Sequence, residues 1–250
     1  MTSKQERRFW WIDLDPGALC RAGQFLDVAV DNPATQVRIL SRMCLTIAVC
    51  AALYGAVFGV WRSPEQAVYA ALKLPLLLFA VVLASSVVNT MLAQVLDVPL
   101  SLATVSLMML TGMAVASVVM ASLAPVVFFF TLQMPPPDPA VVGLPTAHPA
   151  VGPSLRIFRQ LLVMHIAIIG FAGITGNLRL YATLRKLAPS ASLARRVMVA
   201  WLIVSGFVGC ELSWLFSPFI CKPNYPPHLI TRTYWEGNFY EHLYHALTGG

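Results

Sequence analysis

Three ionisable residues lie inside or at the edge of long apolar stretches, and their chemistry suits proton or cation handling. They are Glu211, His165 and Lys73. A carboxylate near an imidazole and an ammonium can hold or pass a proton, because neighbouring charges shift the pKa of each group. An ionisable group at membrane depth is costly, so it marks a functional site by default. The alternative is structural: Glu211 is protonated or hydrogen-bonded between helices, and His165 bonds a backbone carbonyl.

The elements that must position these residues are long stretches without charge. The chain is 58% hydrophobic and only 11% charged, whereas a soluble domain carries roughly 25% charged residues. A bilayer core of about 30 Å needs roughly 20 apolar residues in a helix. We therefore predict an all-α, polytopic transmembrane helix bundle of about five spans. The predicted spans are about 43–61, 74–96, 100–131, 160–178 and 197–220, within a membrane domain at 42–220.

Two other protein classes are disfavoured. A large soluble core is one, but the chain has too little polar sequence to wrap several helices that are apolar all round. Nucleic-acid binding is the other, given the net charge of +6. The basic residues flank apolar segments instead of forming a stripe, so we expect the lipid bilayer as partner and no nucleic acid.

Both ends of the chain read as amphipathic segments that lie at the membrane surface. Residues 1–41 place Trp10 and Trp11 beside basic residues, which is typical of an interfacial anchor on the cytoplasmic side. Residues 221–250 form an aromatic tail in which Trp235 and Phe239 share one helical face. That face suits the outer leaflet, a partner subunit or the protein's own bundle. The chain shows no signal-peptide pattern, so we expect the first span to direct insertion.

A proline-rich linker at 134–153 separates the third and fourth spans. Proline at this density excludes helix and central strand, so we predict an extended external loop. Most of the 17 basic residues fall on the side of the N-terminus. The positive-inside rule then places the N-terminus in the cytoplasm and the C-terminus outside. We expect a multi-pass protein of the bacterial inner membrane.

Small residues favour close helix packing at Gly55 and Gly59 in the first span, which is weak support for oligomerisation. No metal, cofactor or catalytic site is predicted. The five cysteines form no CxxC pair, and no nucleophile, phosphate-binding or zinc motif is present. Glu241, His242 and His245 have spacing that suits a metal, but such groups are more often surface residues. We expect a protein that is not an enzyme.

Four short stretches resemble a group of uncharacterised bacterial five-span membrane proteins. They are 71–75 (ALKLP), 122–125 (SLAP), 214–220 (WLFSPFI) and 237–241 (GNFYE). The span count and cytoplasmic N-terminus are also similar to the Yip family of membrane-trafficking proteins. The resemblance implies a five-helix bundle with a role in membrane organisation, and it carries no catalytic residue.

The leading functional hypothesis is an integral membrane subunit or scaffold of a membrane protein assembly. It would act through membrane protein partners, a homo-oligomer or lipid. The alternative is a small channel or transporter, with Glu211, His165 and Lys73 lining its path in the outer half of the membrane.

Overall fold

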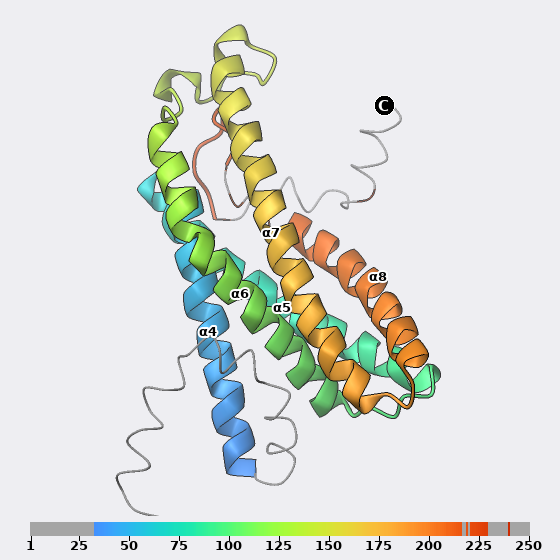
Figure 1. The fold of residues 1–250 in the computed structure, drawn as a ribbon. Helices are drawn as coiled ribbons and strands as arrows, with labels where there is room; N and C mark the ends of the chain where they lie inside the picture. The colour runs from blue at the N-terminus through green and yellow to red at the C-terminus, as the bar shows by residue number, and fades with distance from the viewer. Residues whose placement is uncertain (1–32, 217–218, 220, 230–239, 241–250) are drawn as a thin grey trace, which may run out of the picture.

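Five long helices and two short 3-10 helices make up the fold (Figure 1). The structure is a computed structural model, and it describes residues 33–216, 219, 221–229 and 240. The elements in chain order are α4 (Pro33–Gly59), α5 (Pro64–Val95), α6 (Leu102–Gln133), η1 (Pro139–Val141), η2 (Pro149–Val151), α7 (Gly152–Leu187) and α8 (Ala191–Leu215). The described residues contain no strand, which confirms the all-α prediction.

All five helices are long and apolar enough to cross a membrane, so the chain is a multi-pass membrane protein. The helices extend beyond most of the predicted spans. With 36 residues, α7 is about 54 Å long at 1.5 Å per residue. Trp10, Trp11, Trp235 and Phe239, with the amphipathic segments predicted around them, lie outside the described residues.

Serine caps begin three of the helices at the membrane boundary. The hydroxyls of Ser63, Ser101 and Ser190 accept hydrogen bonds from the backbone N–H three residues later, at the starts of α5, α6 and α8. Such a cap satisfies one of the N–H groups that a helix start leaves unpaired. The turns before α5 and α8 are short, which makes consecutive helices antiparallel.

Two prolines lie inside helices instead of ending them. Pro75 lies within α5, and α6 continues through Pro125 to Gln133. Neighbouring helices in a membrane tolerate such prolines, because local adjustments and side chains satisfy the freed backbone groups. Pro125 therefore does not end α6.

The proline-rich linker is not wholly extended. Pro139 and Pro149 each open a one-turn 3-10 helix, capped by Asp138 and His148 respectively. Proline suits the first turn of a helix, because the N–H that it lacks would have no partner there. The prediction that proline density excludes helix is thus corrected at these two turns.

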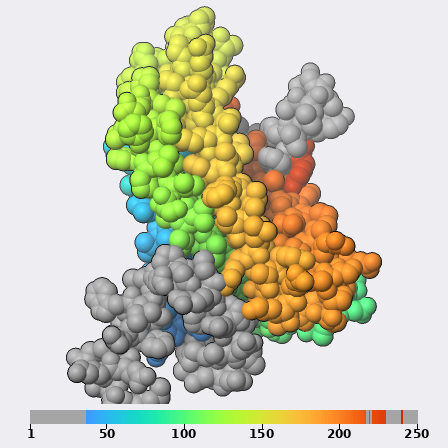
Figure 2. All heavy atoms as spheres, in the orientation of Figure 1, coloured from blue at the N-terminus to red at the C-terminus, as the bar shows by residue number. Residues whose placement is uncertain are grey.

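The five helices do not pack in the order of the sequence. α4 packs against both α5 and α6, α7 packs on α6, and α8 returns to pack on α5. α7 and α8 share few contacts although only a short turn joins them. Figure 1 shows the two helices joined by that turn, and Figure 2 shows α6 and α7 together forming the upper part of this face, with α8 beside the lower half of α7.

Glycines allow the closest helix contacts. A Cβ at Gly55 would lie 2.5 Å from the carbonyl oxygen of Ala70, and one at Gly59 would lie 2.6 Å from the Cα of Ala67. α4 and α5 therefore meet backbone to backbone at this pair of glycines. The small-residue pair that the sequence shows thus serves a contact within the chain, as close packing of membrane helices requires.

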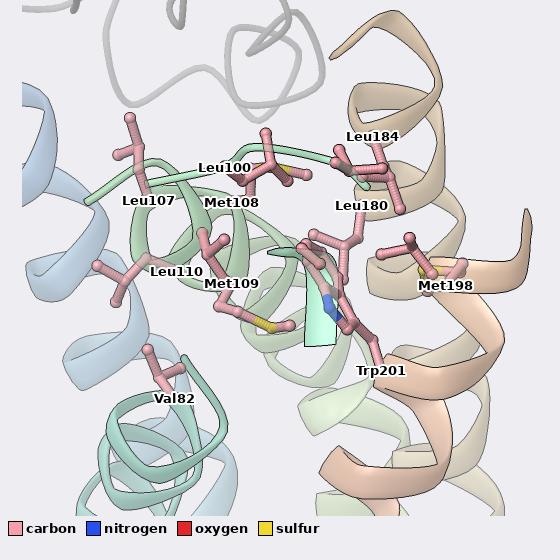
Figure 3. Close-up of a cluster of buried hydrophobic side chains, with 14 of the residues drawn as sticks. Val82, Leu100, Leu107, Met108, Met109, Leu110, Leu180, Leu184, Met198 and Trp201 are labelled. Carbon is pink, nitrogen blue, oxygen red and sulfur yellow. The ribbon is translucent and has the colours of Figure 1, made fainter. Parts of the chain in front are cut away.

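Two buried apolar clusters fill the bundle, one toward each end. The cluster near the turn between α7 and α8 joins helices α4 to α8. Figure 3 shows its larger members: Leu107, Met108, Met109 and Leu110 from α6, Leu180 and Leu184 from α7, and Met198 and Trp201 from α8. The other cluster contains Tyr54 and Phe58 and lies beneath the site described next.

Candidate functional site

Segments far apart in the sequence meet at one end of the bundle. Residues 60–63, 134–151, 219 and 221–229 together form what we call the cap. The indole Nε1–H of Trp61 donates to the carbonyl oxygen of Pro135 at 3.0 Å. The guanidinium Nη2 of Arg62 donates to the carbonyl oxygen of Tyr225 at 2.7 Å. The α4–α5 turn therefore holds both other segments of the cap.

Asn224 completes the cap by joining its two longer segments. Its side-chain amide donates to the carbonyl oxygen of Leu144 at 3.0 Å and to Oγ1 of Thr146 at 3.2 Å. The backbone carbonyl oxygen of Asn224 accepts a hydrogen bond from the N–H of Gly143 at 2.9 Å. Gly143 has a φ of 85°, in the left-handed region that favours glycine. Asn224 is 3% exposed, so these bonds are shielded from water.

Gln66 and Cys221 connect the cap to the helices beneath it. Both side chains are fully buried. The Gln66 amide nitrogen donates to the carbonyl oxygen of Phe219 at 2.7 Å, and its oxygen accepts from the Cys221 thiol at 3.1 Å. Sequence reasoning missed both residues. The sequence signal that could have identified Gln66 is a glutamine in the first turn of an apolar helix.

Lys73 lies below this pair, and its side chain is 4% exposed. Burial raises the pKa of the Cys221 thiol, while a backbone hydrogen bond from His228 and the nearby Lys73 and Arg62 cations act against that rise. Lys73 therefore lies close enough to Cys221 to influence it. Because burial is the largest of these influences, the arrangement favours a neutral thiol that donates to Gln66.

His165 occupies an aromatic pocket next to the same segment. Its Nδ1 lies 3.0 Å from the hydroxyl of Tyr54. Its ring stacks on Phe58 with 4.1 Å between centroids, and the ring of Phe219 lies 6.4 Å away. His165 is 6% exposed. Its hydrogen-bond partner is thus a tyrosine of α4 and not the backbone carbonyl expected for a structural histidine.

Glu211 has a different setting. It is half-buried on α8. Desolvation raises the pKa of the Tyr240 phenol, and the nearby Cys210 and Glu211 side chains raise it further. The Glu211 carboxylate therefore lies near that ring. Tyr240 stacks on Phe207 at 4.4 Å and donates to its carbonyl oxygen at 2.9 Å. The structure thus brings Lys73 close to Cys221 and His165 close to Phe219, and it places Glu211 beside Tyr240.

The described residues contain no group of three His, Cys, Asp or Glu side chains that could hold a metal ion. His242 and His245 lie outside them. Cys44, Cys50 and Cys210 are half-buried free thiols on the helices. The cap site thus contains four buried groups: the thiol of Cys221, the amide of Gln66, the ammonium of Lys73 and the imidazole of His165.

The chain matches no protein-family description, no curated protein and no solved structure. The similarity to the Yip family accordingly stays a prediction.

Proposed function

We propose that this protein is a structural subunit or scaffold of a membrane assembly and acts through its cap. The observation that carries the proposal is the combination of a hydrogen-bonded cap with large exposed side chains. Tyr225 is 49% exposed, Val142 41% and Leu229 39%. All three lie outside the membrane spans. Exposed apolar and aromatic groups on an ordered surface are typical of protein contact sites.

The polar residues in the cap and directly beneath it support the same role. Gln66, Asn224 and Arg62 each bond the backbone of another segment. His165 is enclosed by aromatic rings. Bonds of this kind fix the shape of a surface, and a fixed surface loses less conformational entropy when a partner binds.

The orientation that goes with this proposal places the cap outside the cytoplasm. The opposite end of the bundle carries Arg38 and Arg42 at the start of α4 and a cluster at the α7–α8 turn. That cluster comprises Arg185, Lys186, Arg195 and Arg196. Basic residues next to spans favour the cytoplasmic side. The proposed location is a bacterial inner membrane, with the cap facing the periplasm.

Site-specific photo-crosslinking in native membranes tests the proposal. A photoreactive amino acid replaces Tyr225, and a matched probe replaces Lys222, an exposed residue of the same segment. We expect one discrete protein adduct from position 225 and a much weaker one from 222. Mass spectrometry of the adduct then separates a second copy of this chain from a different protein. Lipid adducts alone from positions 142, 225 and 229 would overturn the proposal.

A small channel or transporter is the second candidate, and burial of the Lys73 ammonium inside α5 favours it. A charged group at that depth is expensive to keep. The test is proton or cation flux into liposomes that contain the purified chain. Lys73→Met and Glu211→Gln should abolish a flux that Lys222→Met preserves. Transport is excluded if the unaltered protein gives the same leak as empty liposomes.

A further inference from the structure

A cavity of about 480 Å³ lies between α5, α6, α7 and α8, and α7 and α8 share few contacts with each other. This volume falls in the range of roughly 300–1,000 Å³ that is usual for small-molecule sites. Its walls are mainly apolar, and Leu77, Met109 and Leu180 are among them. Figure 3 shows the indole of Trp201 reaching toward Met109 and Leu180 at the edge of this region.

The cavity stays open because glycines of α7 and α8 line it. A Cβ built on Gly173 of α7, or on Gly206 or Gly209 of α8, would meet nothing within 4 Å. The neighbouring lining residues Ile169 and Leu202 are 39% and 43% exposed. In a bilayer, these exposed residues face lipid, so the cavity is accessible from the side.

The floor of the cavity is polar, which sets it apart from an ordinary lipid groove. Ser85 lines it and is 1% exposed, and its hydroxyl has no hydrogen-bond partner among the described residues. Ser205 also lines it and accepts from the Asn89 amide at 3.0 Å. The side-chain oxygen Oδ1 of Asn89 has no partner in the described part of the chain. A buried polar group without a partner is costly in hydrocarbon, so it requires an explanation.

We propose that this cavity binds a neutral lipid that has an apolar body and a hydrogen-bonding oxygen. The apolar body fills the space along α7 and α8, and the oxygen bonds the Ser85 hydroxyl. Neutrality follows from the lining, since none of its residues is charged and an unpaired charge at this depth would be strongly disfavoured. A carbonyl or hydroxyl oxygen suits a serine, which both donates and accepts.

This inference goes beyond the proposed scaffold role and does not depend on it. The cap and the cavity use different residues, so loss of a protein partner at Tyr225 would leave lipid binding intact. A water molecule is the competing occupant, because a polar and roomy cavity can hold one. Water would satisfy Ser85 without filling the apolar space along the glycines.

The test uses the full chain purified in detergent, with bound ligand counted by native mass spectrometry. Four probes are compared: a decyl-benzoquinone, a monoacylglycerol, hexadecane and oleate. We expect the decyl-benzoquinone or the monoacylglycerol to bind. Whichever of these two neutral probes binds more strongly identifies the ligand class as quinone or glyceride. Ser85→Val should lower the affinity for that probe about tenfold, the effect of one lost hydrogen bond. Hexadecane, which has no oxygen, should bind weakly and be unaffected by Ser85→Val.

A matched pair of glycine variants locates the bound probe. Gly173→Leu places a side chain in the cavity and should abolish binding. Gly170→Leu lies one turn earlier on α7, where a Cβ also meets nothing within 4 Å, and should preserve it. Gly206→Leu replaces Gly173→Leu if that variant does not fold. The proposal fails if hexadecane or oleate binds as well as the neutral probes, if Ser85→Val has no effect, or if both leucine variants bind normally.

Discussion

The hydroxyl of Tyr54 lies 3.0 Å from Nδ1 of His165, and this hydrogen bond links α4 to α7. These two helices share few other contacts. Phe58 and Phe219 enclose the same imidazole, so the bond is buried among aromatic rings. The bond therefore ties the first helix of the bundle to the fourth directly beneath the cap.

Tyr54→Phe tests this link. The variant keeps the ring but leaves Nδ1 of His165 without its partner, so the free energy of unfolding should fall by about 1–3 kcal/mol. Reversible unfolding in detergent, followed by circular dichroism, measures the change. Tyr69→Phe is the control, since Tyr69 is half-buried on α5 and that variant should change little. Equal stability of the two variants would contradict a structural role for the bond.

Gly55→Ala and Gly170→Ala should have opposite effects. At Gly55 the added methyl would lie 2.5 Å from a backbone oxygen of α5, and such overpacking costs about 1–3 kcal/mol. At Gly170 the methyl meets nothing within 4 Å, so the better helix propensity of alanine should stabilise by up to about 1 kcal/mol. Thermal unfolding of both variants in the same detergent measures the signs. A Gly55→Ala protein as stable as the parent would mean that α4 and α5 do not meet there.

Trp201 is the main side chain that attaches α8 to α5. It is 1% exposed, and its Nε1–H donates to the backbone carbonyl oxygen of Asn89 at 2.8 Å. Trp201→Ala should lower the free energy of unfolding by about 3–5 kcal/mol. Ile203→Ala is the control on the same helix, because Ile203 is 67% exposed. Protease cleavage at the α7–α8 turn should increase in the tryptophan variant alone.

The Cys221 thiol should make the cap sensitive to alkaline pH. Burial raises its pKa above the ordinary value of 9.0, so the folded protein keeps a proton that the unfolded chain releases. Stability is then complete below pH 9 and falls as the pH rises above that value. The melting temperature should fall more between pH 8 and pH 10.5 for the parent than for Cys221→Ser, whose hydroxyl does not titrate there.

The same thiol should resist alkylation in the folded state. Cys221 is fully buried, and its neutral form is a poor nucleophile. A maleimide at pH 7 should modify it only after unfolding in dodecyl sulfate, as peptide mass spectrometry would show. Rapid modification of the folded protein would mean that the cap opens readily.

The number and approximate place of the helices could be predicted from the sequence because charge is excluded from the bilayer core. Helix ends could not, because a helix continues past the hydrocarbon until a cap or turn stops it. α7 begins at Gly152, eight residues before the predicted span 160–178, since Arg156 and Arg159 are compatible with helix though not with lipid. The predicted span 197–220 likewise extends beyond the end of α8 at Leu215.

The candidate site was less accessible to sequence reasoning. Lys73 and His165 were found because ionisable residues in apolar stretches are conspicuous. Gln66 and Cys221 are separated by 155 positions, and only the folding of the last segment back over α5 brings them together. The Ser85 hydroxyl has no partner among the described residues, a fact that could appear only with the neighbouring helices in place.

The packing of α8 on α5, instead of on its neighbour α7, has a consequence for biogenesis. While the first four spans emerge from the ribosome, the α5 face that carries Asn89 has no α8 to cover it, and polar groups there contact lipid or a chaperone. The bundle is completed only when the final span enters the membrane and Trp201 reaches that face. A chain that terminates early would thus expose the Asn89 side chain to the bilayer, where an unpaired polar group is costly.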